Sequence, residues 1–215
     1  MWLLIANVVM LSLLAGLWIM LTQPVLRVRA VPTRLRISSE RLRAHVLMLS
    51  ETLTPRDYNH PENLDRAAAY IQRELEQSRG KVSEQPYKVN GTTYRNVVAL
   101  FGPDAKERIV VGAHYDTCMP YPGADDNASG IAGLIELAGL LGGRELPVQV
   151  ELVAYTLEEP PFFRSPVMGS AVHAQSLRQQ DIRVRAMFAL EMIGYFSDAP
   201  GSQEFPNPVF KLFYP

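Results

Sequence analysis

Apolar residues open the chain as one nearly continuous run. Residues 2–21 are apolar except for Asn7, Ser12 and Gly16. At about 1.5 Å rise per residue such a helix reaches roughly 30 Å, the thickness of the hydrocarbon core of a bilayer. A cleaved signal peptide is the alternative, but no basic segment precedes the run and no small-residue cleavage site follows it. The pattern therefore predicts a single-pass transmembrane anchor at residues 1–23, in contact with membrane lipid through residues 2–21.

Arginine is frequent in the segment that follows, residues 24–37, which we expect to be a basic linker next to the membrane. Arg27, Arg29, Arg34 and Arg36 lie in it, whereas the only positive group before the apolar run is the terminal amine. The positive-inside rule places the next domain on the cytoplasmic side, but exported proteins with signal anchors usually show the opposite bias. The predicted side of the membrane therefore stays open.

Two amphipathic helices are predicted at the start of the remaining domain, residues 38–215. Ser38 or Ser39 is suited to cap a helix that begins near Glu40, because a serine hydroxyl accepts a hydrogen bond from the first helical turn. Pro61 is a favoured first-turn residue, and the apolar residues after it recur at three- and four-residue intervals. Both segments therefore present one apolar face to a core.

Extended segments and alternating strands and helices make up the rest of this domain. Segments 81–89 and 92–100 are expected to form a hairpin at Asn90-Gly91, a dipeptide favoured in two-residue turns. Later elements are predicted as strand, helix, strand, helix and strand, at residues 108–113, 128–141, 148–157, 165–177 and 184–193. Strands that alternate with helices pair in parallel, with right-handed crossovers. The predicted fold class is α/β, with a mixed, mainly parallel sheet flanked by helices and preceded by the transmembrane helix.

Composition and charge exclude several classes of function. The chain has 215 residues, of which 47% are hydrophobic and 20% charged, as is usual for a folded domain. Its net charge of -1 gives no reason to expect nucleic acid as a partner. The single cysteine, Cys118, excludes an intramolecular disulfide, and a catalytic role for its thiolate is disfavoured because no nearby sequence feature supplies a base. Since no glycine-rich phosphate-binding motif is present, no nucleotide cofactor is expected.

Polar side chains gather where the predicted strands end. In α/β sheets the carboxyl ends of the strands form the crevice in which ligands bind. The residues in question are His114 and Asp116 after one strand, Asp125–Asn127 before the next helix, Glu158 and Glu159 after the next strand, and Glu191 in the last one.

Each of these groups has a plainer explanation when it is taken alone. A histidine and an aspartate two residues apart can form a hydrogen-bonded pair at a strand end. Asp125–Asn127 can cap the helix that follows, and two adjacent glutamates can belong to a solvated strand end. Glu191 is the hardest to explain in this way, because it lies in an apolar run where an isolated charge is costly to bury.

The set is more specific than any of its members. If the strands are neighbours, the carboxylates converge and His114 is the basic side chain among them. Two carboxylates about 4 Å apart repel by about 4 kcal/mol at an effective dielectric of 20, so such a cluster needs cations. One imidazole with several carboxylates suits zinc or, less selectively, manganese or cobalt. The residues alone therefore predict a site for divalent metal, with two ions about 3.5–4 Å apart if one carboxylate is shared.

The order of these motifs resembles the co-catalytic zinc aminopeptidase family, which also contains glutamate carboxypeptidases and glutaminyl cyclases. The motifs are His-x-Asp from His114, Asp-Asp-Asn-Ala-Ser-Gly from Asp125, Glu-Glu from Glu158 and Glu-Met-Ile-Gly from Glu191. The resemblance covers about residues 40–200. It implies an aminopeptidase-type hydrolase in which a water activated by two zinc ions cleaves a peptide bond.

Four residues would bind the metal according to this resemblance. His114 and Glu191 would hold one zinc ion and Glu159 the other. Asp126 would bridge the two ions and precede a cis peptide bond to Asn127.

Two further residues would act beside the metal. Asp116 would orient the ring of His114 by accepting its other N–H. Glu158 would be the general base, which takes a proton from the attacking water and returns it to the leaving amine.

Two features depart from the family pattern. The segment of residues 160–164, which follows Glu159, is longer and more apolar than we expect in this family before Met168. It is a candidate wall of the substrate pocket. The family's fifth ligand is a histidine near the end of the domain, whereas no histidine follows His173. His45, His60 and His173 are poor replacements, because the groups that support the ligand would have to move as well. We therefore expect a member truncated at its C-terminus, with two zinc ions in a complete domain and one or none in this chain.

Three functions remain open at this point. An acidic rim suits the free α-amino group of a peptide or small amino-acyl substrate, whereas a carboxypeptidase would need convergent basic residues and only Arg164 is near. A glutaminyl cyclase is the alternative enzyme, and its chemistry uses one zinc ion. The third alternative, which the absent histidine favours, is a catalytically inactive membrane-anchored fragment or binding module. Of these, the aminopeptidase-type zinc peptidase is the preferred interpretation.

Overall fold

The structure, a computed structural model, describes residues 2–22, 37–119, 121–197, 199 and 202. The chain divides into two compact units, one of residues 35–196 and one of residues 1–34 with 197–215. The basic linker predicted at residues 24–37 lies outside the described residues except for Ile37.

Helix α1 spans Trp2–Thr22 in the unit that contains both ends of the chain. A helix needs about 20 consecutive, predominantly apolar residues to cross a bilayer, and none in the described part of the chain is long and apolar enough to do so. The predicted single-pass membrane localisation is therefore wrong, and the transmembrane helix predicted at residues 1–23 is not supported. The lipid contact predicted for residues 2–21 is not tested.

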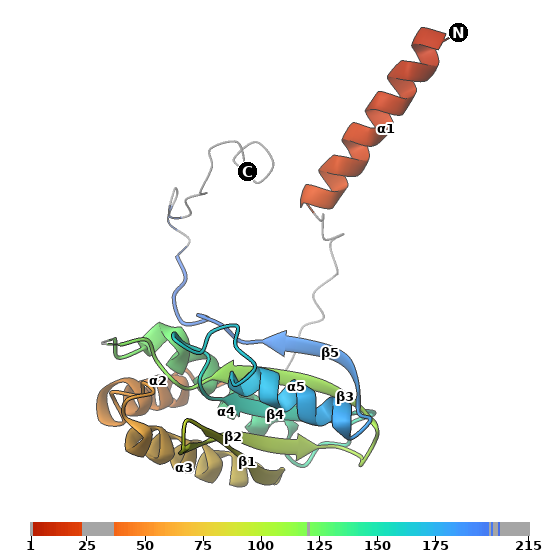
Figure 1. The fold of residues 1–215 in the computed structure, drawn as a ribbon. Coiled ribbons are helices and arrows are strands. Elements are labelled where there is room, and N and C mark those ends of the chain that lie inside the picture. The colour runs from red at the N-terminus through yellow and green to blue at the C-terminus, as the bar shows by residue number, and fades with distance from the viewer. Residues whose placement is uncertain (1, 23–36, 120, 198, 200–201, 203–215) are drawn as a thin grey trace. The chain divides into compact units, whose positions relative to one another are not determined.

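Five strands of the 35–196 unit form one mixed sheet in the order β1-β2-β4-β3-β5 (Figure 1). The strands are β1 (Lys81–Val89), β2 (Thr92–Phe101), β3 (Glu107–His114), β4 (Gln149–Tyr155) and β5 (Arg183–Ala189). β2 pairs antiparallel with β1 and β4, whereas β3 pairs in parallel with β4 and β5. The α/β class and the mixed sheet are confirmed. The sheet is not mainly parallel, because the described strands form as many antiparallel pairings as parallel ones.

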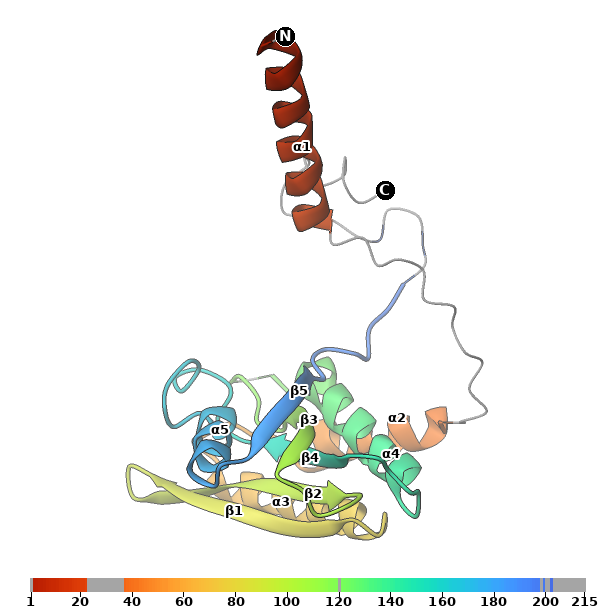
Figure 2. The same ribbon diagram turned by 90° about the vertical axis from the view of Figure 1, so that its right-hand side faces the viewer.

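Helices cover both faces of this sheet (Figure 2). They are α2 (Ser39–Leu47), which continues into the π-helical turn η1 (Met48–Thr52), α3 (Pro61–Glu76), the π-helical turn η2 (Ala124–Ser129), α4 (Gly130–Leu141) and α5 (Gly169–Gln179). α3 and α4 pack on one face, with α2 against α4, and α5 packs on the opposite face.

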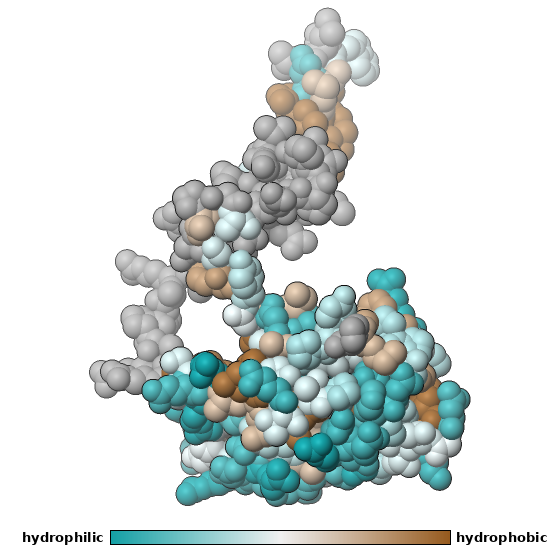
Figure 3. All heavy atoms as spheres, turned by 90° about the vertical axis from the view of Figure 1, so that its left-hand side faces the viewer, coloured by the Kyte–Doolittle hydropathy of each residue, from teal (hydrophilic) through white to brown (hydrophobic). Residues whose placement is uncertain are grey.

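The alternation of side chains along β4 produces these two layers. Leu152 and Ala154 belong to the large core shared with α3 and α4, whereas Val153 and Tyr155 belong to the smaller core beneath α5. Successive side chains of a strand point to opposite faces, so a strand that is apolar at nearly every position is buried on both sides. The face of the unit that Figure 3 shows is largely hydrophilic, with small hydrophobic patches.

Three local signals in the sequence are confirmed. The Ser38 hydroxyl accepts a hydrogen bond from the Arg41 amide at 3.2 Å and caps α2, and Pro61 is the first residue of α3. Asn90 and Gly91 have φ values of 50° and 88°. This left-handed backbone is the conformation that a two-residue hairpin turn requires.

The last strand is shorter than predicted. The prediction extends it over residues 184–193, but β5 ends at Ala189, so Glu191 lies in the loop after the strand. Side chains of η2, rather than a neighbouring strand, accept the hydrogen bonds from the backbone amides of residues 192–194. These bonds take the place of strand pairing and fix the loop.

Candidate metal centre

His114 is the last residue of β3, and only 3% of it is exposed. Its Nε2 atom lies 3.1 Å from Asp126 Oδ1, 3.4 Å from Glu191 Oε1 and 3.8 Å from Glu158 Oε2. These carboxylates come from η2, from the loop after β5 and from the loop after β4. The imidazole is therefore the point on which segments from the ends of three parallel strands converge.

Two groups of ligand atoms suited to a metal ion are present. The atoms of each group lie within 4.8 Å of one another. One group consists of His114, Asp126 and Glu191, and the other of His114, Glu158 and Glu159. The structure thus brings the four predicted metal ligands together and places the predicted general base among them.

Asp116 joins the loops that follow β3 and β4. Its carboxylate oxygens accept hydrogen bonds from the backbone amides of Glu158 at 3.1 Å and Glu159 at 3.0 Å. The Nδ1 atom of His114 lies 3.1 Å from the backbone carbonyl oxygen of Asp116 and 3.5 Å from its Oδ1 atom. The predicted contact of the ring with the carboxylate is therefore the longer of the two, and the carboxylate mainly positions the two glutamates.

Asn127 is a site residue to which the sequence analysis assigned no role beyond a helix cap. Its side-chain amide donates to the Leu190 carbonyl oxygen at 2.8 Å and to Glu191 Oε2 at 3.2 Å. Its Oδ1 atom accepts a hydrogen bond from the Gly130 amide at 3.0 Å. The peptide bond between Asp126 and Asn127 is cis, as the resemblance implied. The sequence holds one clue to this role, because an asparagine directly follows two aspartates. An asparagine amide can donate a hydrogen bond to a carboxylate, whereas a third acid at this position would repel it.

The neighbours of Asn127 hold the same loop. Ser129 Oγ accepts a hydrogen bond from the Ile193 amide at 3.0 Å, and Asp125 Oδ1 accepts one from the Gly194 amide at 2.8 Å. Asp125 belongs to neither ligand group of the described residues. Its carboxylate therefore serves the backbone of the loop.

The cluster perturbs the pKa values of its own members. Burial acts to lower the pKa of His114, but hydrogen bonds to three carboxylates outweigh it and raise the pKa to about 12. The hydrogen bond to His114 lowers the pKa of Asp126. Burial, followed by the charge of Asp126, raises the pKa of Glu159 to about 7. Burial also raises the pKa of Glu158. Burial, with repulsion from the neighbouring acids as a smaller cause, therefore favours a proton on Glu158 and Glu159 unless a cation neutralises the cluster.

The donor atoms fit a divalent metal ion. Asp126 Oδ1 is buried, and apart from its 3.1 Å contact with a protonated His114 Nε2 it has no hydrogen-bond partner among the described residues. The other ring nitrogen lies within hydrogen-bonding distance of the Asp116 carbonyl, so when a metal ion replaces the proton on Nε2, the lone pair of Nε2 points toward the aspartate oxygen. Two lone pairs that face each other are satisfied by a cation between them. One nitrogen with several carboxylate oxygens is a donor set that zinc accepts.

Two of the remaining histidines have partners of their own. His45 Nδ1 lies 2.5 Å from the Tyr70 hydroxyl, and His60 Nδ1 lies 2.8 Å from Asp57 Oδ2. Neither histidine belongs to a ligand group of the described residues.

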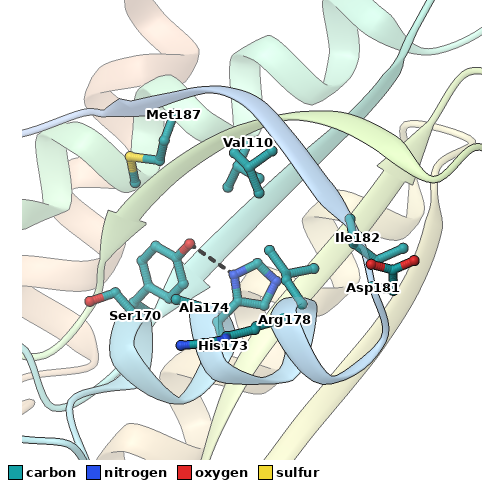
Figure 4. A pocket seen from close by; sticks show the side chains of 11 residues that line it. Val110, Ser170, His173, Ala174, Arg178, Asp181, Ile182 and Met187 are labelled. Atoms are coloured by element: carbon teal, nitrogen blue, oxygen red, sulfur yellow. Dashed lines mark hydrogen bonds between the residues drawn. The ribbon is translucent and has the colours of Figure 1, made fainter.

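The third, His173, borders a separate cavity of about 580 Å³ between α5 and β5 (Figure 4). Its ring is hydrogen-bonded to the Tyr155 hydroxyl at 3.1 Å, as the dashed line in Figure 4 shows. Its Nε2 atom lies 3.3 Å from Glu151 Oε1, which also binds Arg108 at 3.2 Å. The lining of this cavity contains none of the carboxylates that surround His114. The cavity is therefore distinct from the candidate metal centre.

Cys118 lies near the cluster without being activated by it. Burial, followed by the charges of Glu159 and Asp126, raises the pKa of its thiol. A raised pKa reduces the fraction of reactive thiolate. The geometry therefore adds no support for a catalytic cysteine.

Comparisons with known proteins identify related sequences and folds. A family model described as Peptidase family M28 matches residues 96–209. The uncharacterized protein YfbL of Escherichia coli (strain K12) is 47% identical over 197 residues, which cover 87% of this chain. The chain spans 60% of the length of that relative.

Solved structures share the fold at lower sequence identity. BSAP, a zinc aminopeptidase from Bacillus subtilis, matches 75% of this chain and 71% of its own chain with a TM-score of 0.65 at 12% identity. Bacteroides thetaiotaomicron glutaminyl cyclase bound to N-acetylhistamine matches 74% of this chain and 63% of its own chain with a TM-score of 0.62 at 22% identity. At these identities the likeness shows the fold alone.

Proposed function

Because the chain belongs to peptidase family M28, we propose that it cleaves the first peptide bond of a peptide or small amino-acyl substrate with the help of bound zinc. One observation carries the proposal: the His114 Nε2 atom lies within 3.8 Å of carboxylate oxygens from Asp126, Glu158 and Glu191. A buried imidazole among carboxylates from separate loops offers nitrogen and oxygen atoms of the kinds that bind zinc.

The two ligand groups suggest how zinc is held. His114, Asp126 and Glu191 would hold one ion, since catalytic zinc sites commonly have three protein ligands. Glu159 would hold a second ion with Asp126 as the shared ligand, and this ion would need a further ligand beyond the two groups of described residues. When bound, zinc supplies the Lewis acidity that polarises the scissile carbonyl and makes a water molecule more acidic.

Glu158 is the proposed general base. Its backbone amide binds the Asp116 carboxylate at 3.1 Å, and its side chain is 29% exposed, so it is held beside the ligands and can still reach a substrate. Burial raises its pKa, which increases its affinity for a proton near neutral pH. Glu158 accepts a proton from the attacking water and returns it to the leaving amine.

The charge of the site supports an amino-terminal substrate. The glutamates and aspartates around His114 attract a protonated α-amino group, whereas a carboxypeptidase needs a cation for the substrate's carboxylate. The basic residue nearest in sequence to Glu158 and Glu159 is Arg164. Its guanidinium carbon lies 5.2 Å from the centroid of the Phe163 ring, on which the guanidinium stacks.

A glutaminyl cyclase is the second candidate, because a cyclase shares this fold and the group of His114, Asp126 and Glu191 is sufficient for a single ion. The two activities differ in their products. A peptidase releases the amine of an aminoacyl-p-nitroanilide, whereas a cyclase releases ammonia from an amino-terminal glutamine and leaves the next bond intact.

Turnover of aminoacyl-p-nitroanilides by the purified chain in the presence of zinc tests the proposal. We expect wild-type protein to release p-nitroaniline and Glu158→Ala to lose about 10²- to 10⁴-fold in rate, because the general base is removed. Glu62→Ala is the matched control, since Glu62 is exposed in the first turn of α3, and it should retain full activity. Wild-type protein no more active than Glu158→Ala would contradict the peptidase proposal and support an inactive binding module.

A further inference from the structure

Arg56 is a fully buried arginine in the loop between η1 and α3, with 0% of the residue exposed. In the described part of the chain, its guanidinium binds four backbone carbonyl oxygens rather than a carboxylate. A buried charge is costly unless its hydrogen bonds are satisfied. An arginine placed in this way therefore needs an explanation.

The four carbonyl groups lie far apart in sequence. The Nε atom of Arg56 donates to the carbonyl oxygen of Tyr115 at 2.8 Å. Nη1 donates to the carbonyl oxygens of Leu49 and, at 3.1 Å, of Pro122. Nη2 donates to the carbonyl oxygen of Gly123 at 3.1 Å. One guanidinium thus connects the η1 turn, the end of β3 and the turn before η2.

Two of these segments carry proposed metal ligands. Tyr115 directly follows His114, and Gly123 lies three residues before Asp126. The distance between the two ligands therefore depends on where Arg56 holds the backbone on either side.

Arg56 also flanks Asp116. Its side chain binds the Tyr115 carbonyl oxygen, and its own carbonyl oxygen accepts a hydrogen bond from the Thr117 amide at 3.1 Å. The Asp116 carboxylate in turn binds the backbone amides of the two glutamates after β4. Arg56 thus fixes the backbone on both sides of Asp116, and Asp116 in turn fixes the loop that carries the proposed general base.

Arginine suits these acceptors better than lysine does. A guanidinium presents five N–H groups in a planar fork, whereas an ammonium group presents three from one point. The turn is also tightly packed: a Cβ atom added to Gly123 would lie 2.3 Å from the Asp126 carbonyl oxygen and 3.1 Å from Arg56 Nη2. Gly123 has a φ of +62°, which favours glycine.

We propose that Arg56 is a positioning residue of the metal centre, which holds the end of β3 and the turn before η2 at the separation at which His114 and Asp126 bind the same zinc ion. The inference rests on the proposed function, because it takes these two residues as ligands. It goes beyond that function because Arg56 contacts neither metal nor substrate. Loss of groups that orient ligands typically weakens metal binding about 10- to 100-fold, and substitution of Arg56 should have an effect of this size.

Zinc affinity is measured on the full chain by competition with a chromophoric chelator. The variants are Arg56→Lys, which keeps the charge but not the fork, and Arg56→Gln, which loses the charge. Arg108→Lys is the matched control, because Arg108 is also a largely buried arginine, with a side chain that is only 11% exposed and that binds Glu151. Arg108 lies on β3 six residues before His114, which places it about 20 Å from that ligand. We expect zinc binding to weaken about tenfold in Arg56→Lys and more in Arg56→Gln, and to stay unchanged in the control.

A second measurement separates positioning from general stability. A ligand that binds only the folded state stabilises it according to its own affinity, so the rise in unfolding temperature on adding zinc is compared with the metal-free form of the same variant. We expect this rise to be smaller in both Arg56 variants. The absorption spectrum of bound Co²⁺ should change as well, because the ligand geometry is altered.

Three results would count against these assignments, and they can be told apart. If Arg56 serves only the fold, its substitution will lower the unfolding temperature of the metal-free protein. The zinc affinity, the zinc-induced rise in unfolding temperature and the Co²⁺ spectrum will then stay as in wild type, and this result overturns the inference. Failure of both Arg56 variants to fold, with or without zinc, also overturns it. Wild-type protein that binds no zinc contradicts the proposed function itself.

Discussion

Three residues of the candidate centre, Glu191, Glu158 and His114, are each held by a second polar group. Glu191 binds the amide of Asn127 at 3.2 Å, and the backbone of Glu158 binds the carboxylate of Asp116 at 3.1 Å. The ring of His114 contacts the Asp116 carbonyl oxygen at 3.1 Å. Like charges at these separations would otherwise spread apart, so the supporting groups hold the ligands in place and their loss weakens metal binding.

Replacing Asn127 with alanine tests this dependence at a single residue. The change removes the donor to Glu191 and the acceptor for the Gly130 amide. We expect zinc binding about 10- to 100-fold weaker and a free energy of unfolding lower by about 1–3 kcal/mol, because buried polar groups lose their partners. Chelator competition and urea unfolding measure the two effects. Asn63→Ala on α3, which removes one exposed bond from Arg66, should change neither, and unaltered zinc affinity in Asn127→Ala would show that Glu191 does not need this support.

At the scale of elements, the parallel strands β4, β3 and β5 deliver the site to one edge of the sheet, as the pattern of strands and helices predicted. The hairpin, the cap of α2 and the start of α3 were equally predictable, because each depends on residues close together in sequence. The end of β5 was not, since the groups that stop it are the side chains of Asn127, Ser129 and Asp125, more than sixty residues earlier. The role of Arg56 was also hidden, because its partners are backbone carbonyls that carry no signal in the sequence.

A pH dependence is expected where α2 packs against α3 and α4. His45 is buried there with the Tyr70 hydroxyl 2.5 Å from its Nδ1 atom. Burial lowers the pKa of His45 below its ordinary value of 6.5, although the charges of Glu74 and Glu136 oppose this and that of Arg41 adds to it. The neutral ring is therefore the form that stabilises the folded state. Its contribution is fully present above about pH 6.5 and is lost as the pH falls through the lower pKa of the folded state.

Urea unfolding of wild type and His45→Gln between pH 7.5 and 5.5 measures this contribution. We expect the free energy of unfolding of the wild type to fall more steeply with decreasing pH, by up to about 1.4 kcal/mol per pH unit for one proton. Equal slopes for the two proteins would show that His45 is protonated as readily in the folded chain as in the unfolded one.

At the scale of the whole molecule, the chain combines an M28 family match over residues 96–209 with a sheet whose parallel half carries the acidic cluster. The family was predictable from four short motifs. Their convergence on His114 follows from where these residues lie, at the end of β3, in η2 and in the loops after β4 and β5, and their roles remain predictions. The antiparallel pairing of β2 with β4 was not predicted, since nothing local in either strand specifies its neighbour. The membrane prediction failed, and the domain limits drawn with it remain predictions.

Zinc content tests the central claim most directly, because every role proposed for the chain assumes that the acids around His114 bind divalent cations. The purified full chain and its His114→Ala variant are equilibrated with zinc, dialysed against metal-free buffer and analysed by atomic emission. The account predicts that wild-type protein retains about one zinc ion, because the two three-residue ligand groups of the described residues share His114, and that the variant retains essentially none. Equal zinc content in the two proteins, or none in either, would contradict it.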